Sequence, residues 1–487
     1  MSICVDVHLL SGKRAAVEVE TDASVESLRR RAQSALVVPS RGRLLSSSGE
    51  LLDGAQTVTE AKLTSGDVLT LHVNQVQLKA VRNGHSAAFA ALLGDGSVVT
   101  WGDAYFGGDS SAVRDQLRDV QQIQASSHAF AAILGDGSAV TWGYARFGGD
   151  SSAVQDQLRD VQQIQASFGA FAAVLGDGSM VTWGGAISGG DSSAVQDQLR
   201  DVQQIQASDQ AFAAILGDGS VVTWGLADFG DDSSAVQEQL RDVQQIQASS
   251  GAFAAILGDG SVVTWGDADD GGDSSAAQEQ LRDVQQIQAS RRAFAAILID
   301  GSVVTWGGAN HGGDSSVVRD QLRDVQQIQA SYAAFAAIRS DGSVVTWGDA
   351  CCGGHSSVVQ DQLQDVQQVQ ASRRAFAAIL GDGGVVSWGD AGHGGDSSAA
   401  QEQLHDVQQV QASSYAFAAI LGDGSVVTWG SANYGGDSRR VQDQLRDVQQ
   451  IQASHGAFAA ILGDGSVVTW GDADHGGDSR AVQEQLK

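Results

Sequence analysis

Most of this chain repeats one pattern of apolar and polar positions. In the copy at residues 201–242, the segments VQQIQAS (202–208), AFAAIL (211–216) and VVTWG (221–225) are rich in β-branched or aromatic residues and predict three strands. Between the second and third segments lies GDGS, and Asp-Gly between two apolar runs predicts a tight hairpin whose two central residues have positive φ. Apolar residues on both faces of these strands indicate a sheet packed between two neighbouring sheets.

The rest of the copy, GLADFGDDSSAVQEQLRD, predicts a connection with a short helical turn. Asp232 and Ser233 offer an N-terminal cap for a turn over residues 235–240. So short a helix is unstable alone, so packing must hold it. Each copy is therefore expected to contain three strands, one hairpin and one helical connection.

The copies recur with a fixed period. The tryptophans of the chain follow one another at 41-residue intervals, at Trp101, Trp142, Trp183, Trp224, Trp265, Trp306, Trp347, Trp388, Trp429 and Trp470. A period near 40 with strand-like segments predicts the blades of a β-propeller, here ten copies over residues 75–487. A tryptophan at the same position of every copy is expected to pack between blades. The pattern leaves open a closed ring, an open spiral or a partial ring.

Residues 1–74 contain no copy of the repeat and predict a separate unit. Alternating Ile3, Val5 and Val7 and a returning strand near residues 16–19 indicate a β-hairpin, in which Cys4 is expected in the core. Apolar residues at helical spacing predict a helix over 25–35, and further strands are expected near 42–45 and 67–73. The expected buried face of the helix consists of Val25, Leu28, Ala32 and Ala35.

The two units differ in net charge. Residues 1–74 carry 8 Lys and Arg against 9 Asp and Glu, whereas the repeats carry 21 against 49, so nearly all of the net charge of −29 lies in the repeats. Such a field repels phosphate backbones, and we expect no nucleic-acid or membrane binding by the repeats.

The cysteines and the N-terminus bear on location. Cys4, Cys351 and Cys352 cannot form a disulfide framework, which favours a reducing compartment. The segment MSICVDVHLLSGKR has no signal-peptide pattern, and no stretch approaches 18 apolar residues. We therefore expect a cytoplasmic or nuclear location and neither secretion nor a membrane span.

The first unit resembles ubiquitin. The resemblance rests on LSGK at the first turn (10–13), RLL (43–45), ELLDG (50–54) and SGDVLTLHV (65–73), and it implies a β-grasp domain over residues 1–74. Because the chain continues as NQVQLKAV where ubiquitin has its terminal diglycine, the unit is similar to non-conjugated ubiquitin-like domains. The resemblance implies a partner-binding patch of Leu10, Leu45 and His72, the last of which replaces an aliphatic residue of the family.

The repeat resembles that of the regulator of chromosome condensation family. The segments that carry the resemblance are VQQIQAS, AFAAIL and DGSVVTWG followed by a glycine pair. The copies depart from that family in being shorter, in having GGDS where GQLG is usual, and in numbering ten instead of seven. Similar repeats occur in large HECT-type ubiquitin ligases.

The copies differ from one another mainly at two places, just before AFAAIL and just after TWG. In an up-down-up sheet both places lie at the same end of the blade, whereas the Asp-Gly hairpin lies at the other end. Loop tips also vary without function, so drift remains an alternative. Since Tyr, Phe, Arg and His carry much interface energy, we expect a partner-binding face there. Its expected residues are Tyr105, Phe106, His128, Arg146, Phe147, Phe168, Ile187, Arg291, Arg292, His311, Tyr332, Arg373, Arg374, Tyr415, Tyr434 and His455.

Catalytic and metal chemistry finds little support in the sequence. Asp-Ala-Asp near Asp267 and Asp472 lacks the later glutamate of a calcium loop, and adjacent Cys351 and Cys352 lack metal-ligand spacing. No Walker sequence, nucleophile elbow or zinc-hydrolase motif occurs. We therefore expect no catalytic residue, no metal and no cofactor.

These observations predict a mainly β, non-enzymatic interaction scaffold or adaptor, with a link to ubiquitin signalling. The resemblances imply two alternatives: the substrate-binding part of a HECT-type ubiquitin ligase system, without the catalytic lobe, and a guanine-nucleotide exchange factor for a small GTPase. Fold alone does not decide among them.

Overall fold

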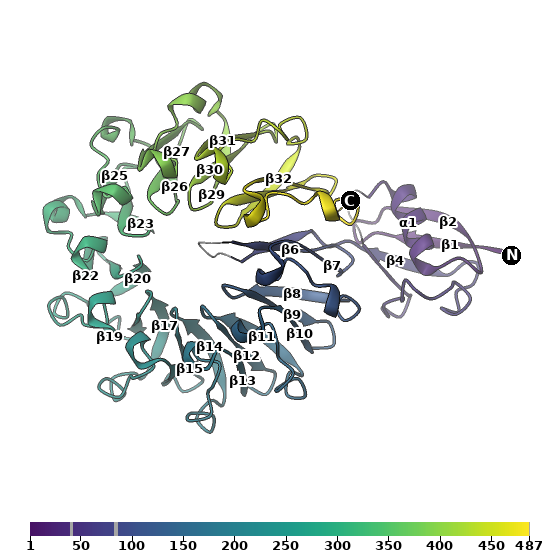
Figure 1. The fold of residues 1–487 in the computed structure, drawn as a ribbon, viewed down its shortest axis with the longest axis horizontal. Helices are drawn as coiled ribbons and strands as arrows, with labels where there is room; N and C mark the ends of the chain where they lie inside the picture. Colours follow the sequence, from purple (N-terminus) through teal and green to yellow (C-terminus); the bar gives the residue numbers. More distant parts are fainter. Residues whose placement is uncertain (39–41, 82–85, 487) are drawn as a thin grey trace.

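The chain folds into a ring of small sheets with a separate unit outside it (Figure 1). The computed structural model describes residues 1–38, 42–81 and 86–486. Ten three-stranded sheets form the ring, and a four-stranded sheet with one helix forms the outer unit. The fold is therefore mainly β, as the sequence predicts.

The outer unit is a β-grasp domain. Its sheet has the strand order β2-β1-β4-β3, with β1 parallel to β4 and the other pairs antiparallel. Val5, Val7 and Leu69 of the sheet are buried against Leu28 and Leu36 of the helix. The elements are β1 (Ser2–His8), β2 (Arg14–Glu20), α1 (Val25–Leu36), β3 (Arg43–Leu45) and β4 (Val68–His72).

Two expectations for this unit are wrong. Cys4 is exposed and not in the core, because it alternates with the inward-facing Val5 on the same strand. Ala35 is exposed and Leu36 is buried in its place, since the helix extends one residue further and Leu36 falls on the core side. Val37 caps the C-terminal end of the helix in a left-handed conformation with φ 53°.

Each ring blade is an antiparallel meander of a first, second and third strand. In Figure 1 the labels β29, β30 and β31 run outward from the middle, so the first strands line the inside of the ring. The first strands are β5 (Gln77–Ala80), β8 (Val120–Ala125), β11 (Val161–Ala166), β14 (Val202–Ala207), β17 (Val243–Ala248), β20 (Val284–Ala289), β23 (Val325–Ala330), β26 (Val366–Ala371), β29 (Val407–Ala412) and β32 (Val448–Ala453).

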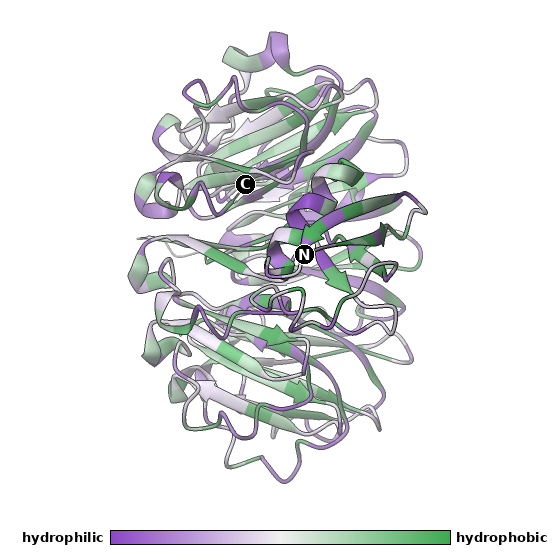
Figure 2. Ribbon diagram, turned by 90° about the vertical axis from the view of Figure 1, so that its right-hand side faces the viewer, coloured by the Kyte–Doolittle hydropathy of each residue, from purple (hydrophilic) through white to green (hydrophobic). Residues whose placement is uncertain are grey.

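The second strands are the most buried part of the ring, and the third strands cover them on the outside. Figure 2 shows the strands as mainly hydrophobic and the loops as mainly hydrophilic. The second strands are β6 (Ala88–Leu92), β9 (Ala129–Leu134), β12 (Ala170–Leu175), β15 (Ala211–Leu216), β18 (Ala252–Leu257), β21 (Ala293–Leu298), β24 (Ala334–Arg339), β27 (Ala375–Leu380), β30 (Ala416–Leu421) and β33 (Ala457–Leu462). The third strands are β7 (Val98–Gly102), β10 (Ala139–Gly143), β13 (Met180–Gly184), β16 (Val221–Gly225), β19 (Val262–Gly266), β22 (Val303–Gly307), β25 (Val344–Gly348), β28 (Val385–Gly389), β31 (Val426–Gly430) and β34 (Val467–Gly471).

The hairpin between the second and third strands forms where the sequence predicts it, but its turn type differs from the prediction. Of Asp136 and Gly137 only Gly137 has a positive φ, of 78°. The amide of Gly137 donates to Leu134 O at 3.0 Å, and that of Leu134 donates to Ser138 O at 2.9 Å. This pattern is a type I turn followed by a left-handed glycine. Asp136 stabilises the turn by accepting from the amide and hydroxyl of Ser138 at 2.9 and 2.6 Å.

The connections also differ from the prediction. In the fourth copy residues 234–239 form successive turns instead of a helix. Other copies form 3₁₀ helices there, namely η2 (Ser111–Val113), η8 (Ser316–Gln321), η10 (Gln360–Gln362), η12 (Ser398–Gln403) and η15 (Arg480–Val482). A second 3₁₀ turn, which the sequence did not lead us to expect, follows every third strand: η1 (Ala104–Phe106), η3 (Ala145–Phe147), η4 (Ala186–Ser188), η5 (Ala227–Phe229), η6 (Ala268–Asp270), η7 (Ala309–His311), η9 (Ala350–Cys352), η11 (Ala391–His393), η13 (Ala432–Tyr434) and η14 (Ala473–His475).

The tryptophans join each blade to the preceding one, as expected. Trp306 stacks on Phe294 of its own blade, with ring centroids 5.2 Å apart. Its indole Nε1 donates to Gly271 O of the preceding blade at 3.0 Å. Gly271 has φ +100°, and a Cβ atom there would lie 2.6 Å from Phe294 Cδ2, so only glycine fits this close approach.

The ring closes on itself. Trp101 of the first blade donates to Gly476 O of the last blade at 3.0 Å, the same bond that joins consecutive blades. Phe89 and Trp101 of the first blade share a core cluster with Ile461 and Leu486 of the last. The first blade therefore packs on the last as any other blade packs on its predecessor.

The β-grasp unit contacts the ring at the Asp-Gly end of the first two blades. Arg43 of β3 forms an ion pair and hydrogen bond with Asp119 and donates to Val120 O at 3.1 Å. The Arg43 side chain is only 10% exposed to solvent. Asp119 precedes β8 in a left-handed conformation with φ 55°, and its carbonyl accepts from the amide of Gly135.

Candidate interaction surface

The two variable places of every copy lie at one end of the ring, opposite the Asp-Gly hairpins. We call this end the variable face; it comprises the loops between first and second strands and the 3₁₀ turns after the third strands. The loops are linked from blade to blade by backbone hydrogen bonds of 2.9–3.3 Å in which the amide of each first variable residue donates to the carbonyl of the next. Each residue is bonded in this way to the next in the series Ser127, Phe168, Asp209, Ser250, Arg291, Tyr332, Arg373, Ser414 and His455.

Each 3₁₀ turn brings the exit of one blade against the loop of the next. Phe106, at the exit of the first blade, stacks on His128 of the second at 4.5 Å. Behind the loop, the Ser126 hydroxyl accepts from the amide of Ala129 at 3.1 Å and donates to Phe147 O at 3.1 Å. Equivalent buried serines occur in the following copies, so the loops rest on a fixed hydrogen-bonded base.

An aromatic cluster occupies the variable face over the first three blades. His128 lies at its centre, 4.2 Å from the ring of Phe147 and 5.8 Å from that of Phe168. Tyr105 and Tyr144 approach to 4.2 Å beside them. Tyr105 is 51% and Phe168 44% exposed, unusually high for aromatic side chains. The cluster consists of Tyr105, Phe106, His128, Tyr144, Phe147 and Phe168.

Burial in this cluster lowers the pKa of His128 below its usual value. The neutral ring can then stack on its neighbours without the cost of desolvating a charge. The Ser127 hydroxyl lies 2.6 Å from His128 Nδ1 and holds the ring in place.

A second cluster, on the sixth to eighth blades, combines arginine with tyrosine. The guanidinium groups of Arg291 and Arg373 lie over the Tyr332 ring, with Cζ 4.9 and 4.7 Å from its centroid. Arg292 pairs with Asp270 of the fifth blade at 3.0 Å. Burial, together with Arg292 and Arg291, lowers the pKa of His311, which keeps this ring neutral near neutral pH.

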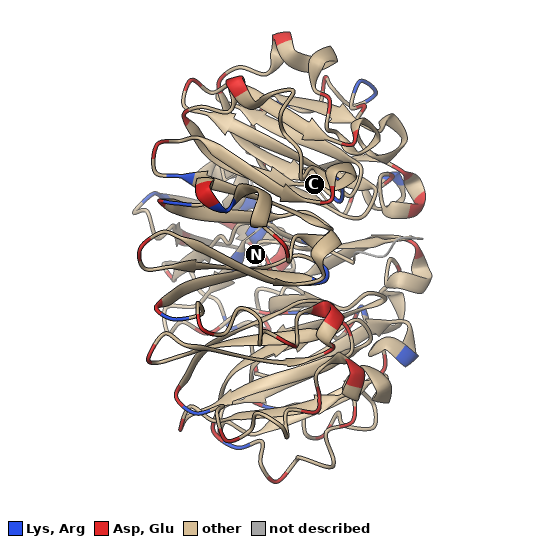
Figure 3. Cartoon of the chain, turned by 90° about the vertical axis from the view of Figure 1, so that its left-hand side faces the viewer, with Lys and Arg blue, Asp and Glu red and all other residues tan. Residues whose placement is uncertain are grey.

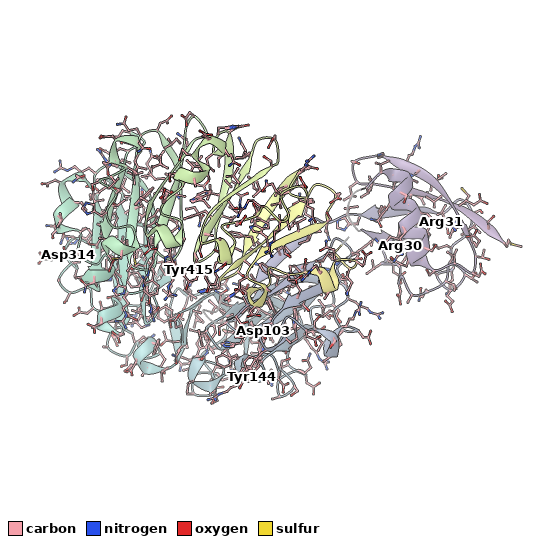
Figure 4. All side chains as sticks on the ribbon, turned by 45° about the horizontal axis from the view of Figure 1, so that its top comes forward. Arg30, Arg31, Asp103, Tyr144, Asp314 and Tyr415 are labelled. Carbon is pink, nitrogen blue, oxygen red and sulfur yellow. The ribbon has the colours of Figure 1, made fainter. Side chains whose placement is uncertain are left out.

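A third cluster lies on the eighth to tenth blades. Tyr415 stacks on Tyr434 at 4.5 Å and on His393 at 4.6 Å. His455 lies edge-on to Tyr415 at 5.3 Å and stacks on His475 at 5.4 Å. Figure 4 places Tyr415 and Tyr144 on different parts of the ring. The variable face therefore carries two aromatic clusters with the arginine cluster between them along the chain.

The remaining expected residues are dispersed. Ile187 is exposed at the exit of the third blade, Arg146 is exposed beside the aromatic cluster, and Arg374 is exposed beside Arg373. In the β-grasp unit Leu10 is 79% exposed, whereas Leu45 and His72 are half-buried on neighbouring strands.

Sequence reasoning missed Tyr144, His393 and His475 of these clusters. Tyr144 immediately follows TWG, two places before the variable pair of Arg146 and Phe147, and its place differs between copies. Cys351 is exposed and Cys352 buried, and burial raises the pKa of the Cys352 thiol, which makes it less reactive near neutral pH.

Acidic charge is distributed over the loops of the whole ring, whereas the strands are nearly uncharged (Figure 3). Most acidic residues recur at fixed places of the repeat, as Asp218, Asp232, Glu238 and Asp242 do in the fourth copy. The variable positions carry five arginines, four of which, Arg291, Arg292, Arg373 and Arg374, lie in or beside the second cluster. Arginine is thus concentrated on these blades of an acidic molecule, where Asp270 neutralises Arg292.

Two kinds of feature are absent from the described residues. Within residues 1–38, 42–81 and 86–486, no helix has the length and apolar character needed to span a bilayer. The same part of the chain contains no group of three or more His, Cys, Asp or Glu side chains placed to hold a metal ion.

Comparison with known proteins places the first unit in a family. Residues 3–76 match the model of the ubiquitin family. A search of curated proteins found no match to the chain. The chain therefore combines a ubiquitin-family domain with a closed propeller of ten three-stranded blades.

Solved structures with some similarity include Prp20p from Saccharomyces cerevisiae, with 14% identity over 74% of this chain and 83% of that chain and a TM-score of 0.35. The ectodomain of the Physcomitrella patens receptor kinase CR4 shows 13% identity over 56% of this chain and 73% of that chain, with a TM-score of 0.33. Ubiquitin of Caldiarchaeum subterraneum shows 20% identity over 15% of this chain and 91% of that chain, with a TM-score of 0.14.

Proposed function

We propose that this chain is a non-enzymatic protein interaction scaffold that binds a protein partner through its variable face, and that its ubiquitin-like unit connects this partner to ubiquitin signalling. One observation carries the first part: the aromatic cluster on the first three blades, in which Tyr105 and Phe168 are exposed and Tyr144 is half-buried beside Tyr105. Exposed, clustered aromatic side chains are typical of binding surfaces, because their burial by a partner is strongly favourable.

The positions of the cluster support this proposal over drift. Its aromatic residues come from three different blades, yet they contact one another instead of pointing apart. The loops that carry them are tied by backbone hydrogen bonds, so little conformational entropy is lost on binding. The ubiquitin-family match of residues 3–76 supports the link to ubiquitin signalling.

The test is affinity capture from cell extract with the intact chain and with the variant Tyr105→Ser, Tyr144→Ser, Phe168→Ser. Losing three aromatic anchors should weaken capture of specific partners at least about tenfold. A matched control is Ile299→Ser, Val317→Ser, Val358→Ser, which removes three exposed apolar side chains outside the variable face. Equal capture by all three proteins would refute the proposal. Nucleotide-release and ubiquitin-discharge assays test the exchange-factor and ligase alternatives separately.

A further inference from the structure

The cluster of Arg291, Tyr332 and Arg373 differs in chemistry from the aromatic cluster. Its arginines come from the sixth and eighth blades and approach the tyrosine of the blade between them. The amide of Arg291 donates to Tyr332 O at 3.2 Å, and the amide of Tyr332 donates to Arg373 O at 3.0 Å. The three backbones are therefore fixed in a row, and the ring of Tyr332 holds both guanidinium groups in position.

None of these arginines forms a direct ion pair with a described residue. Asp209 and Asp270 act on Arg291 only at longer range, and so does Asp390 on Arg374. Among residues 1–38, 42–81 and 86–486, Asp270 pairs with Arg292, while no carboxylate lies within ion-pairing distance of Arg291, Arg373 or Arg374. In a chain with a net charge of −29, unpaired carboxylates are abundant elsewhere. With no direct ion pair, the donors of the three guanidinium groups face solvent or a ligand. Each guanidinium offers a planar set of donors that suits carboxylates.

The spacing indicates which ligand fits. Since Tyr332 lies between Arg291 and Arg373, the two guanidinium groups cannot converge on one small anion without leaving the ring. Two separate anionic groups on one extended segment satisfy both arginines at once, and the exposed Arg374 beside Arg373 offers a further guanidinium. Arginine clusters recognise acidic motifs in this manner.

We propose that Arg291, Arg373 and Arg374, arranged around Tyr332, bind an extended protein segment rich in aspartate and glutamate. The inference rests on the proposed function in that it names the chemistry of a partner segment on the variable face. It uses blades other than those of the aromatic cluster, so the two can be tested apart.

The experiment measures fluorescence anisotropy of a labelled twelve-residue peptide of alternating Glu and Ser against the full chain. The intact chain should bind it, with affinity falling as salt rises from low to physiological concentration. The variant Arg291→Gln, Arg373→Gln, Arg374→Gln should weaken binding about 100-fold, from roughly fivefold for each charge-assisted contact. The matched control Arg118→Gln, Arg159→Gln, Arg200→Gln removes the same charge from exposed arginines off this face and should change it less than about twofold.

Several results would overturn the inference. An equal loss in the control variant would show a general charge effect, and equal binding of a Gln and Ser peptide would show that carboxylates are not recognised. Displacement of the acidic peptide by submillimolar inorganic phosphate would assign the site to a single small anion. Circular dichroism and thermal melting verify that each variant folds.

The aromatic variant separates this inference from the proposed function. Tyr105→Ser, Tyr144→Ser, Phe168→Ser should bind the acidic peptide like the intact chain, because its changes lie on the first three blades. If the peptide fails to bind while cellular partners are still captured through the aromatic cluster, the acidic-segment inference is wrong and the proposed function stands. If the peptide binds while the aromatic variant captures partners normally, the acidic-segment inference stands and the proposed role of the aromatic cluster is wrong.

Discussion

Trp101 and Gly476 lie 375 residues apart in sequence, and the indole Nε1 of the first donates to the carbonyl oxygen of the second at 3.0 Å. The bond repeats the one that joins Trp142 to Gly107 at 3.1 Å, and Phe89 stacks on Trp101 at 5.3 Å as in the other blades. The closing interface is thus built like the interfaces between consecutive blades, which makes closure open to a direct test.

We predict that Trp101→Phe destabilises the ring as much as Trp265→Phe does at an internal interface. Each change removes a buried hydrogen bond and leaves a glycine carbonyl without its donor, at a cost of about 1–3 kcal/mol in free energy of unfolding. Urea unfolding of both variants measures this. A loss of stability for Trp265→Phe with none for Trp101→Phe would mean that the ring is open in solution.

We predict that Gly271→Ala destabilises the protein by about 3 kcal/mol. Its φ of +100° disfavours any side chain, and the new Cβ would lie 2.6 Å from Phe294 Cδ2 in a packed interface. Gly392→Ala is the control, because Gly392 lies in the equivalent turn of another blade but has only Asp390 Oδ1 at 3.1 Å near its Cβ position. Similar urea midpoints for the two variants would contradict the prediction.

We predict that stability falls between pH 7.5 and pH 5.5, partly through His128. Burial lowers its pKa in the folded state below the usual value of 6.5, so the unfolded chain binds the proton more readily. The part of the free energy of unfolding that depends on a neutral His128 is fully present above pH 6.5. It is lost as the pH falls from there through the folded-state pKa. Thermal melts of His128→Phe should show a shallower decline, whereas the exposed His355→Phe should not. An unchanged slope in His128→Phe would refute the assignment.

We predict that Arg43→Gln detaches the ubiquitin-like unit from the ring without unfolding either. Arg43 makes the ion pair with Asp119 and the bond to Val120 O, and the neutral amide cannot replace both. The radius of gyration by small-angle X-ray scattering should increase, and proteolysis within residues 73–76 should accelerate. Arg30→Gln, at an arginine 74% exposed on the helix, is the control. Identical scattering for both variants would show that the contact does not position the unit.

This contact also bears on the ubiquitin-like patch. Arg43 lies opposite His72 in the strand pairing, and Leu45 follows two residues later on the same face. A receptor that covers Leu45 and His72 would therefore approach the Arg43 contact. We expect such receptors to bind Arg43→Gln more strongly than the intact chain.

Local pattern was sufficient for much of the fold. The strands at 211–216 and 221–225 have the predicted bounds, because apolar runs between Asp-Gly turns depend little on distant neighbours. The turn type was wrong, since Asp218 stabilises its turn through bonds to Ser220 and has no need of a positive φ. The 3₁₀ turns after TWG contain the variable residues themselves, where apolar periodicity gives no signal.

The sequence predicted which positions form the candidate surface but not which of its side chains contact one another. That the two variable places share one end follows from the meander within a single blade. Which side chains meet depends on how one blade is rotated against the next, and so Phe106 against His128 and Arg291 against Tyr332 could not be derived from spacing. These contacts join different copies of the repeat, and the pattern of one copy does not contain them.

The bond between each tryptophan and the glycine of the preceding blade has a consequence for assembly. Because Trp306 and Trp101 use the same kind of bond, an incompletely folded chain has no chemical signal that distinguishes its own last blade from that of another molecule. Tethering supplies the distinction, since the two ends of one chain meet at a high effective concentration. When many unfolded chains are present together, the same uniformity favours exchange of blades between molecules. Dilution and covalent continuity thus favour correct closure, together with the bonds of Ser86 and Ala87 to Asp474 O that the other described interfaces lack.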